Sequence, residues 1–470
     1  MEEREVRSHV IIPEGIEIRD YQREAIQNWR NNGYIGVYDM ATGTGKTITA
    51  ILSIRNLELH CNGRLGVVIL CPYKHLVDQW AEELKKFGIE PIIGYSGSKY
   101  GDFSRLLESK VRRYHRNKED FFTFLTTNET FKRDDIQYIL NRFQGKLLLV
   151  SDEAHTMGTE SRLLFLTDNF DYRLALSATF ERKWDADGTK ELYSFFGKTV
   201  FSYSLAKAIE NGILTPYEYY PIICNLDENE YKEYIHLSKE LQKHILASGD
   251  SITLSEKGKM LLIQRSKVVA GAKAKLVRLD DLMDRFKNEK GMLVYCGATT
   301  VYGTKERQID AVTNLLSNKY HIVTNQFTCE EKTDERKELL RKLENGEIQA
   351  LTAIKCLDEG VNIPSTKVVF ILASANNSKE YVQRRGRVLR KAPGKEKSVI
   401  FDFVALPYTD KSDVEEILIS GTKYDLSLVK RELNRIDEFG RLALNSKEVM
   451  LVKNQICDKF GLPNSFFEEE

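Results

Sequence analysis

The sequence predicts an α/β protein whose parallel sheets are doubly wound. Short apolar runs alternate with segments of helical periodicity, which is the pattern of right-handed strand–helix–strand units. Runs such as residues 65–70 are almost continuously apolar, as expected for parallel strands that are buried on both faces. The alternation starts before residue 40 and starts again at residue 291, after a largely helical stretch. We therefore expect two α/β domains in tandem.

Length and composition agree with this organisation. The chain has 470 residues, enough for two or three domains that each bury a core. Lys and Arg together number 69, as do Asp and Glu, and the resulting zero net charge neither indicates nor excludes a nucleic-acid partner. No apolar stretch is long enough to span a bilayer, and residues 1–7 lack the apolar core of a signal peptide. The seven cysteines contain no Cys-x-x-Cys pair, so we expect reduced thiols and neither a zinc site nor a disulfide framework. Together with the lack of a membrane span and of a signal peptide, this leads us to expect no membrane partner and a cytoplasmic location.

The first predicted element is a helix that begins near residue 20. Asp20 is a suitable cap, and apolar residues recur at helical spacing as far as Trp29. Arg19 and Gln22 lie at the start of this helix. A glutamine amide offers both a donor and an acceptor, which suits the paired edge of adenine, although polar residues at a helix start are also common on ordinary surfaces. Arg19 and Gln22 are therefore candidates for contact with a nucleotide base.

The next segment has the pattern of a phosphate-binding loop. The apolar residues 34–38 precede Met40-Ala-Thr-Gly-Thr-Gly-Lys-Thr47, and a helical pattern follows over residues 48–54. Glycines let such a loop wrap tightly, so that its N–H groups and the helix N-terminus face an anion, whereas the alternative is a simple turn before a helix. Lys46 is placed to reach the β- and γ-phosphates of a nucleoside triphosphate, and the Thr47 hydroxyl to bind Mg²⁺. The predicted phosphate site consists of Thr42, Gly43, Thr44, Gly45, Lys46 and Thr47.

Further strands are predicted at residues 65–70, 89–94 and 121–127, with helices over 76–84 and 131–143. The densest basic stretch of the chain is residues 110–118. Two interpretations stay open for this stretch, a solvated helix face and a contact with nucleic acid.

A second chemical landmark ends the apolar strand at residues 146–151. It continues as Asp152-Glu-Ala-His155, and strand ends are where a doubly wound sheet binds ligands. Asp152 can bind Mg²⁺, which prefers carboxylates and retained waters. Glu153 is placed to orient and deprotonate an attacking water. An Asp-Glu pair also occurs as a plain helix cap, but its position after an apolar strand and downstream of a phosphate loop favours catalysis.

These segments resemble the motifs of the superfamily 2 DEAD/DEAH-box helicases, in the family's order. The resemblance rests on Arg19-Asp-Tyr-Gln22, residues 41–47, Asp152-Glu-Ala-His155, Ser177-Ala-Thr179, residues 351–364 and Tyr381-Val-Gln-Arg-Arg-Gly-Arg-Val-Leu-Arg390. It implies two tandem RecA-like domains that use ATP and Mg²⁺. Ser177 and Thr179 either link the hydrolysis site to the second domain or satisfy a turn.

The family's last two motifs add residues from the second half of the chain. Arg387 and Arg390 match the positions whose guanidinium groups stabilise charge on the γ-phosphate during transfer. The resemblance also carries Asp358, Gly360 and Gln383 to the nucleotide site. Motif V departs from the family pattern, because Asn362 stands where aspartate is commoner.

The first motif and motif VI resemble those of restriction-enzyme motor subunits and of transcription-repair helicases, which act on double-stranded DNA. The resemblance implies an ATP-dependent helicase or translocase that acts on DNA in preference to RNA. The sequence contains no nuclease constellation, so a motor of a restriction or phage-defence complex would need a nuclease partner. An RNA helicase or sensor, and a nucleotide-switched clamp, stay open as alternatives.

The expected organisation has four parts. Residues 1–212 form the first RecA-like domain, and residues 213–275 form a linker with a helical insertion. Residues 276–408 form the second RecA-like domain, and residues 409–470 form a C-terminal helical segment. Within the linker, Pro216 and Pro221 flank an extended segment that is a linker or a strand entering the second domain.

Overall fold

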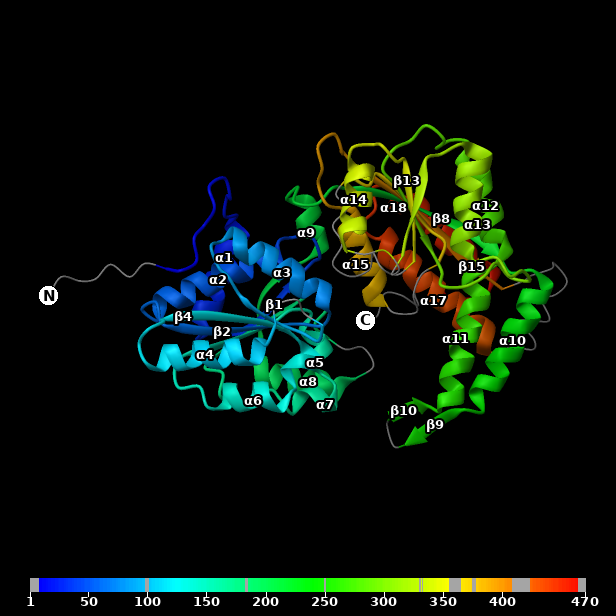
Figure 1. Ribbon diagram of the computed structural model, residues 1–470. Coiled ribbons are helices and arrows are strands. Elements are labelled where there is room, and N and C mark those ends of the chain that lie inside the picture. Colours follow the sequence, from blue (N-terminus) through cyan, green and yellow to red (C-terminus); the bar gives the residue numbers. More distant parts are fainter. Residues whose placement is uncertain are drawn as a thin grey trace. The chain divides into compact units, whose positions relative to one another are not determined.

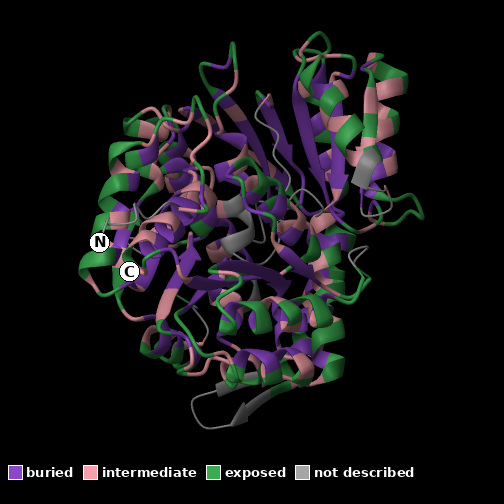
Figure 2. Cartoon of the chain, turned by 60° about the vertical axis from the view of Figure 1, so that its left-hand side comes forward, coloured by how far each residue is buried: buried purple, intermediate pink, exposed green. Residues whose placement is uncertain are grey.

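The computed structural model describes residues 8–97, 101–181, 185–248, 251–328, 331, 333–354, 365–373, 378–407 and 423–463. The chain divides into two compact units, Met1–Ile213 and Leu214–Glu470 (Figure 1). Each unit contains one parallel sheet with helices on its faces. In Figure 2 the strands of both sheets are mostly buried, and exposed residues follow the outer sides of the helices.

In its described part, the first unit has a sheet of seven parallel strands in the order β3-β4-β2-β5-β6-β1-β7. The strands are β1 (Ile35–Met40), β2 (Leu65–Cys71), β3 (Ile92–Gly94), β4 (Phe121–Thr127), β5 (Leu147–Ser151), β6 (Tyr172–Ser177) and β7 (Thr199–Tyr203). Strand β6 lies between β1 and β5, so the ends of the two strands that lead into the phosphate loop and the carboxylate pair lie at the same edge of the sheet.

Helices cover both faces of this sheet. They are α1 (Asp20–Asn31), α2 (Lys46–His60), α3 (Lys74–Lys86), α4 (Phe103–His115), α5 (Asn128–Phe131), α6 (Asp134–Asn141), η1 (Ala154–Met157), α7 (Glu160–Leu163), α8 (Ala186–Phe196) and α9 (Leu205–Glu210). In Figure 1, α1, α2 and α3 lie on one face, and α4 and α6 lie on the other. On the second face, apolar side chains of α4, α6 and α8 form one core with the sheet. The doubly wound arrangement follows from helices that alternate between the faces.

Among the residues that the structure describes, the main sheet of the second unit has six parallel strands in the order β12-β13-β11-β14-β15-β8. These are β8 (Tyr217–Asn225), β11 (Met292–Cys296), β12 (Thr324–Phe327), β13 (Ala350–Ile354), β14 (Val368–Ile371) and β15 (Ser398–Leu406). The segment expected to be a linker or an entering strand is β8, which pairs with β15 along its whole length. The second sheet therefore begins well before residue 276.

The helices of the second unit are α10 (Glu228–Gln242), α11 (Glu256–Ala270), α12 (Lys273–Met283), α13 (Gln308–Asn314), η2 (Leu315–Lys319), α14 (Thr333–Glu344), α15 (Ser378–Val388), α17 (Lys423–Gly440) and α18 (Ser446–Lys459). Helices α10 and α11 pack side by side, and the antiparallel strands β9 (Ile245–Ser248) and β10 (Ser251–Leu254) lie at their far end (Figure 1). Helix α10 ends at Gln242, and residues 245–248 pair with β10 instead of continuing the helix.

The C-terminal helices belong to the core of the second unit. Apolar residues of α17, among them Leu428, Leu433 and Ile436, are buried. The Tyr217 hydroxyl of β8 donates to the backbone carbonyl of Phe439 at 2.6 Å. The fold class predicted from the sequence is thereby confirmed, with two doubly wound parallel sheets, a helical insertion and a C-terminal helical segment. The four-part division of the chain stays a prediction.

None of the helices that the structure describes combines the length and the apolar composition that a membrane span requires.

Candidate functional site

The loop after β1 has the backbone geometry of an anion site. Gly43 and Gly45 have φ angles of 89° and 85°, a left-handed conformation that costs other residues roughly 1–2 kcal/mol. Gly45 is the N-cap of α2, which begins at Lys46. The backbone N–H groups of the first helical turn, among them those of Lys46 and Thr47, therefore have no partner within the helix. The loop and the helix N-terminus together can therefore surround a phosphate group.

Tyr21, from the first turn of α1, is hydrogen-bonded to this loop. Its hydroxyl donates a hydrogen bond of 2.6 Å to the backbone carbonyl of Thr44 and accepts one of 3.0 Å from the Arg19 guanidinium. Its ring stacks on Tyr203 of β7, with 4.2 Å between the ring centroids. Arg19 and Thr44, both expected at the nucleotide site, are thus connected through one hydroxyl group.

Gln22 lies beside the loop but is buried, with 4% of its surface exposed. Its Nε2 donates to Thr49 Oγ1 at 3.1 Å, and its Oε1 accepts from the backbone N–H of Arg19 at 3.0 Å. Both ends of the amide are therefore engaged with groups of the protein. Its contact with adenine stays a prediction.

Asp152 and Glu153 follow β5 directly. The Asp152 carboxylate accepts one hydrogen bond on each oxygen, from Trp80 Nε1 at 2.8 Å and from the backbone N–H of Glu153 at 2.9 Å. Burial, and then the charge of Glu153, raise the pKa of Asp152 to about 6, although Lys46 acts in the opposite direction. A cation beside Asp152 would favour its charged form, and carboxylate and hydroxyl oxygens such as those of Asp152 and Thr47 are the donors that Mg²⁺ prefers.

Lys46 faces Glu153 across the site. The distance from Lys46 Nζ to Glu153 Oε1 is 3.8 Å, and both side chains are more than four-fifths buried. Within the part of the chain that the structure describes, Lys46 Nζ and Thr42 Oγ1 are buried without a hydrogen-bond partner. Buried polar groups are normally hydrogen-bonded, so an unsatisfied ammonium beside the glycine loop fits an anionic ligand.

The backbone of Glu153 is strained. Its φ of 45° and ψ of 50° are left-handed, which costs a non-glycine residue about 1–3 kcal/mol and is typical of functional sites. The following turn holds it in place, since the Thr156 N–H donates to the Glu153 carbonyl at 2.9 Å. Asn128 Nδ2 donates to Thr156 Oγ1 at 2.9 Å, and Arg162 donates to the Thr156 carbonyl at 2.6 Å. No sequence motif points to Asn128 or Arg162, because their contacts with Thr156 depend on how the chain folds around this turn.

Ser177 connects the end of β6 to the same turn. Its hydroxyl lies 3.4 Å from His155 Nδ1 and accepts a hydrogen bond of 3.1 Å from the Thr179 N–H. These contacts show the turn and add a link from Ser177 to His155 within the first unit, and the proposed link to the second domain stays a prediction.

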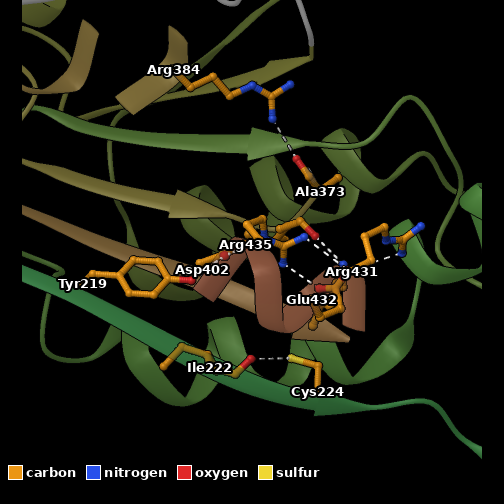
Figure 3. A network of polar contacts seen from close by, with 11 residues as sticks. Tyr219, Ile222, Cys224, Ala373, Arg384, Asp402, Arg431, Glu432 and Arg435 are labelled. Atoms are coloured by element: carbon orange, nitrogen blue, oxygen red, sulfur yellow. Dashed lines mark hydrogen bonds and ion pairs between the residues drawn. The ribbon is translucent and has the colours of Figure 1, made fainter. Parts of the chain in front are cut away.

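In the second unit, α15 carries Gln383 and Arg387, and Arg390 follows it. Burial, and then the charge of Arg387, lower the pKa of Arg390 to about 10. Two neighbouring arginines of the same helix have structural contacts. Arg384 donates to the carbonyl of Ala373 at 3.0 Å (Figure 3), and Arg385 pairs with Glu438 of α17 at 2.6 Å. Asp358 and Gly360 lie outside the described residues, as does Asn362.

Basic residues of α4 form ion pairs with carboxylates of the same unit. Lys110 and Arg113 both pair with Glu119, the latter at 3.1 Å, and Arg112 pairs with Glu108 at 2.7 Å. These pairs favour the solvated helix face over a contact with nucleic acid.

Comparisons with known proteins agree with the motifs. The family model of the type III restriction enzyme res subunit matches residues 15–182, and that of the helicase conserved C-terminal domain matches residues 274–392. The chain is 24% identical over 402 residues to the DNA 3'-5' translocase XPB2 of Sulfurisphaera tokodaii, an alignment that covers 81% of this chain and 80% of that protein.

Among solved structures, the chain resembles the ATP-dependent type ISP restriction-modification enzyme LlaBIII bound to DNA, with a TM-score of 0.59 and 19% identity. That match covers 90% of this chain but only 29% of LlaBIII. The helicase domain of Pyrococcus furiosus Hef matches with a TM-score of 0.51 and 18% identity, over 86% of this chain and 98% of that domain. These structural likenesses establish a common fold of two tandem RecA-like domains.

Proposed function

Because the chain belongs to the superfamily 2 helicases, we propose that it is an ATP-driven motor that moves along or unwinds DNA. The observation that supports this most directly is the unsatisfied Lys46 ammonium, 3.8 Å from Glu153 and beside a glycine loop. A phosphate group would satisfy Lys46, and a carboxylate beside it would act on an attacking water. The preference for DNA is supported by the relatives, since XPB2 is named a DNA translocase and the LlaBIII structure contains DNA.

The proposed roles are those of a phosphoryl transfer to water. Lys46 and the N–H groups of residues 42–47 bind the phosphates, while Glu153 orients and deprotonates the water. Thr47 and Asp152 would hold Mg²⁺, which when bound neutralises charge on the β- and γ-phosphate oxygens. From the second half of the chain, Arg387 and Arg390 are proposed to stabilise charge on the γ-phosphate. Further nucleotide contacts are assigned, from the family resemblance, to Arg19, Gln22, Asp358, Gly360 and Gln383.

We also propose that the motor serves a restriction or phage-defence complex and works with a nuclease chain. The res-subunit family model and the likeness to LlaBIII support this role, and the sequence lacks a nuclease constellation of its own. A cytoplasmic location is consistent with the five described cysteines, which are all free thiols.

The deciding experiment measures the ATPase rate without polymer and with single-stranded DNA, double-stranded DNA or RNA, using Lys46→Ala as the blank. We expect double-stranded DNA to stimulate hydrolysis most, because the relatives are DNA motors. Stimulation by RNA alone would replace this proposal with an RNA helicase or sensor. An ATPase that no polymer stimulates, in the presence of tight nucleotide-dependent DNA binding, would indicate a clamp.

A second prediction concerns Tyr21. Tyr21→Phe removes the hydroxyl that connects Arg19 to the Thr44 carbonyl but keeps the stack on Tyr203. A net loss of about 1 kcal/mol for the hydrogen bond to the Thr44 carbonyl, the one that contacts the loop, corresponds to a rise of roughly fivefold in the KM for ATP, with little change in kcat. Steady-state kinetics test this, with Tyr138→Phe as the control because the Tyr138 hydroxyl contacts only Arg142 among the described residues. Equal KM values for the two variants would contradict this role of the Tyr21 hydroxyl.

A further inference from the structure

The indole ring of Trp80 contacts the carboxylate that the family resemblance assigns to Mg²⁺. Trp80 Nε1 donates to Asp152 Oδ2 at 2.8 Å, across 72 positions of the sequence. Trp80 is 2% exposed and Asp152 is 8% exposed, so water has little access to this hydrogen bond. Neither the motif pattern nor the family resemblance assigns a role to Trp80.

The fold brings the two residues together through neighbouring strands. Strand β2 leads into α3, which carries Trp80, and β5 leads into Asp152. The two strands pair, with Leu70 opposite Ser151, and the Asp152 N–H donates to the Leu70 carbonyl at 2.8 Å. Trp80 lies on the buried stripe of α3, where helical spacing directs it toward the sheet.

The indole N–H satisfies one oxygen of a carboxylate that is largely removed from water. The backbone N–H of Glu153 satisfies the other oxygen. A buried carboxylate without donors is strongly disfavoured in its charged form, and hydrogen bonds to the anion offset that cost. Each carboxylate oxygen can accept more than one hydrogen bond, so each retains a lone pair for a cation. The two donors therefore fix the plane of the carboxylate and leave a lone pair on each oxygen available to a cation.

We propose that Trp80 is a positioning residue. Its indole N–H holds the Asp152 carboxylate in the orientation that binds the Mg²⁺ of the Mg²⁺–nucleotide complex. This role rests on the proposed nucleotide site and extends it to a residue of α3. Groups that orient a metal ligand typically affect metal affinity about 10–100-fold when they are removed.

The chain contains a matched control in Trp29. Its ring is also completely buried in the first unit, and its Nε1 donates to the backbone carbonyl of Arg173 at 3.1 Å. Trp29→Phe and Trp80→Phe thus remove the same buried N–H and a similar ring area. Only Trp80→Phe removes a donor from Asp152.

The test compares these two variants in the full-length protein. A fluorescent ATP analogue reports binding directly, titrated with Mg²⁺ and, separately, in the presence of EDTA. We expect Trp80→Phe to raise the Mg²⁺ concentration for half-maximal binding about 10–100-fold, with affinity in EDTA unchanged. Trp29→Phe should match the wild type in both measurements. An equal Mg²⁺ requirement for the two variants would overturn the proposal.

A second measurement applies if Trp80→Phe folds poorly. The sequence has three tryptophans, so Trp29→Phe combined with Trp184→Phe leaves Trp80 as the single source of an indole N–H NMR signal. That signal should shift when Mg²⁺ is added to the nucleotide-bound protein, and an unmoved signal would overturn the proposal. Failure of the wild type to bind nucleotide more tightly than Lys46→Ala would instead refute the nucleotide site itself.

Discussion

Replacing Glu153 with glutamine should abolish ATP turnover while nucleotide binding is retained. Glutamine has the shape of glutamate, so the turn after β5 should keep its geometry, but it cannot accept a proton from water. Loss of a general base typically lowers the rate by about 10²–10⁴-fold. Single-turnover hydrolysis measures the chemical step, and binding of a fluorescent ATP analogue measures affinity.

Glu90→Gln is a suitable control for this result. Glu90 belongs to the same unit, is 79% exposed and pairs only with Lys85, at 3.6 Å, among the described residues. Its replacement should leave both measurements unchanged. Hydrolysis at the wild-type rate in Glu153→Gln would contradict the assignment of Glu153 as the base.

The second large effect is expected in the core of the second unit. Arg435 of α17 pairs with Asp402 of β15 at 2.7 Å and with Glu432 at 2.7 Å, and all three side chains are at least nine-tenths buried (Figure 3). Tyr219 donates to Asp402 Oδ2 at 2.8 Å. Glu432 also acts on Lys275, whose pKa burial lowers to about 8 against the opposing charge of Glu432. The ion pair with Asp402 therefore connects α17 to the sheet.

Arg435→Met should destabilise the second unit by about 3–5 kcal/mol, because it leaves the buried Asp402 without its cation and leaves Glu432 paired with Arg431 alone, at 3.2 Å. Chemical denaturation followed by circular dichroism measures the change in the free energy of unfolding. Arg441→Met is the matched control, since Arg441 is 67% exposed and pairs with Glu438 at 3.6 Å just after the same helix. The control should change stability by less than about 1 kcal/mol. Equal effects of the two substitutions would contradict a structural role for the buried network.

Local sequence was sufficient to predict the features that depend on neighbouring residues. The loop between β1 and α2 needs left-handed glycines, and the positions of Gly43 and Gly45 before Lys46 meet that need. The alternation of apolar runs with helical patterns predicted the doubly wound class, because burial on both faces leaves a strand almost no polar positions. The carboxylate pair at residues 152 and 153 was recognisable for the same reason, as the first charges after an apolar strand.

Contacts between distant segments were decided only by the tertiary structure. Whether β8 joins the second sheet depends on its pairing with β15, about 180 residues later, and β8 has no sequence pattern that distinguishes it from a linker. The Trp80–Asp152 and Arg435–Asp402 contacts likewise depend on which strands are neighbours. A sequence specifies period and turn chemistry locally, whereas strand order and the burial of polar partners follow from the packing of the whole unit. For that reason the sequence alone determined the glycine loop after β1 and the class of fold, and the tertiary structure decided which residues contact Asp152 and the turn at Glu153.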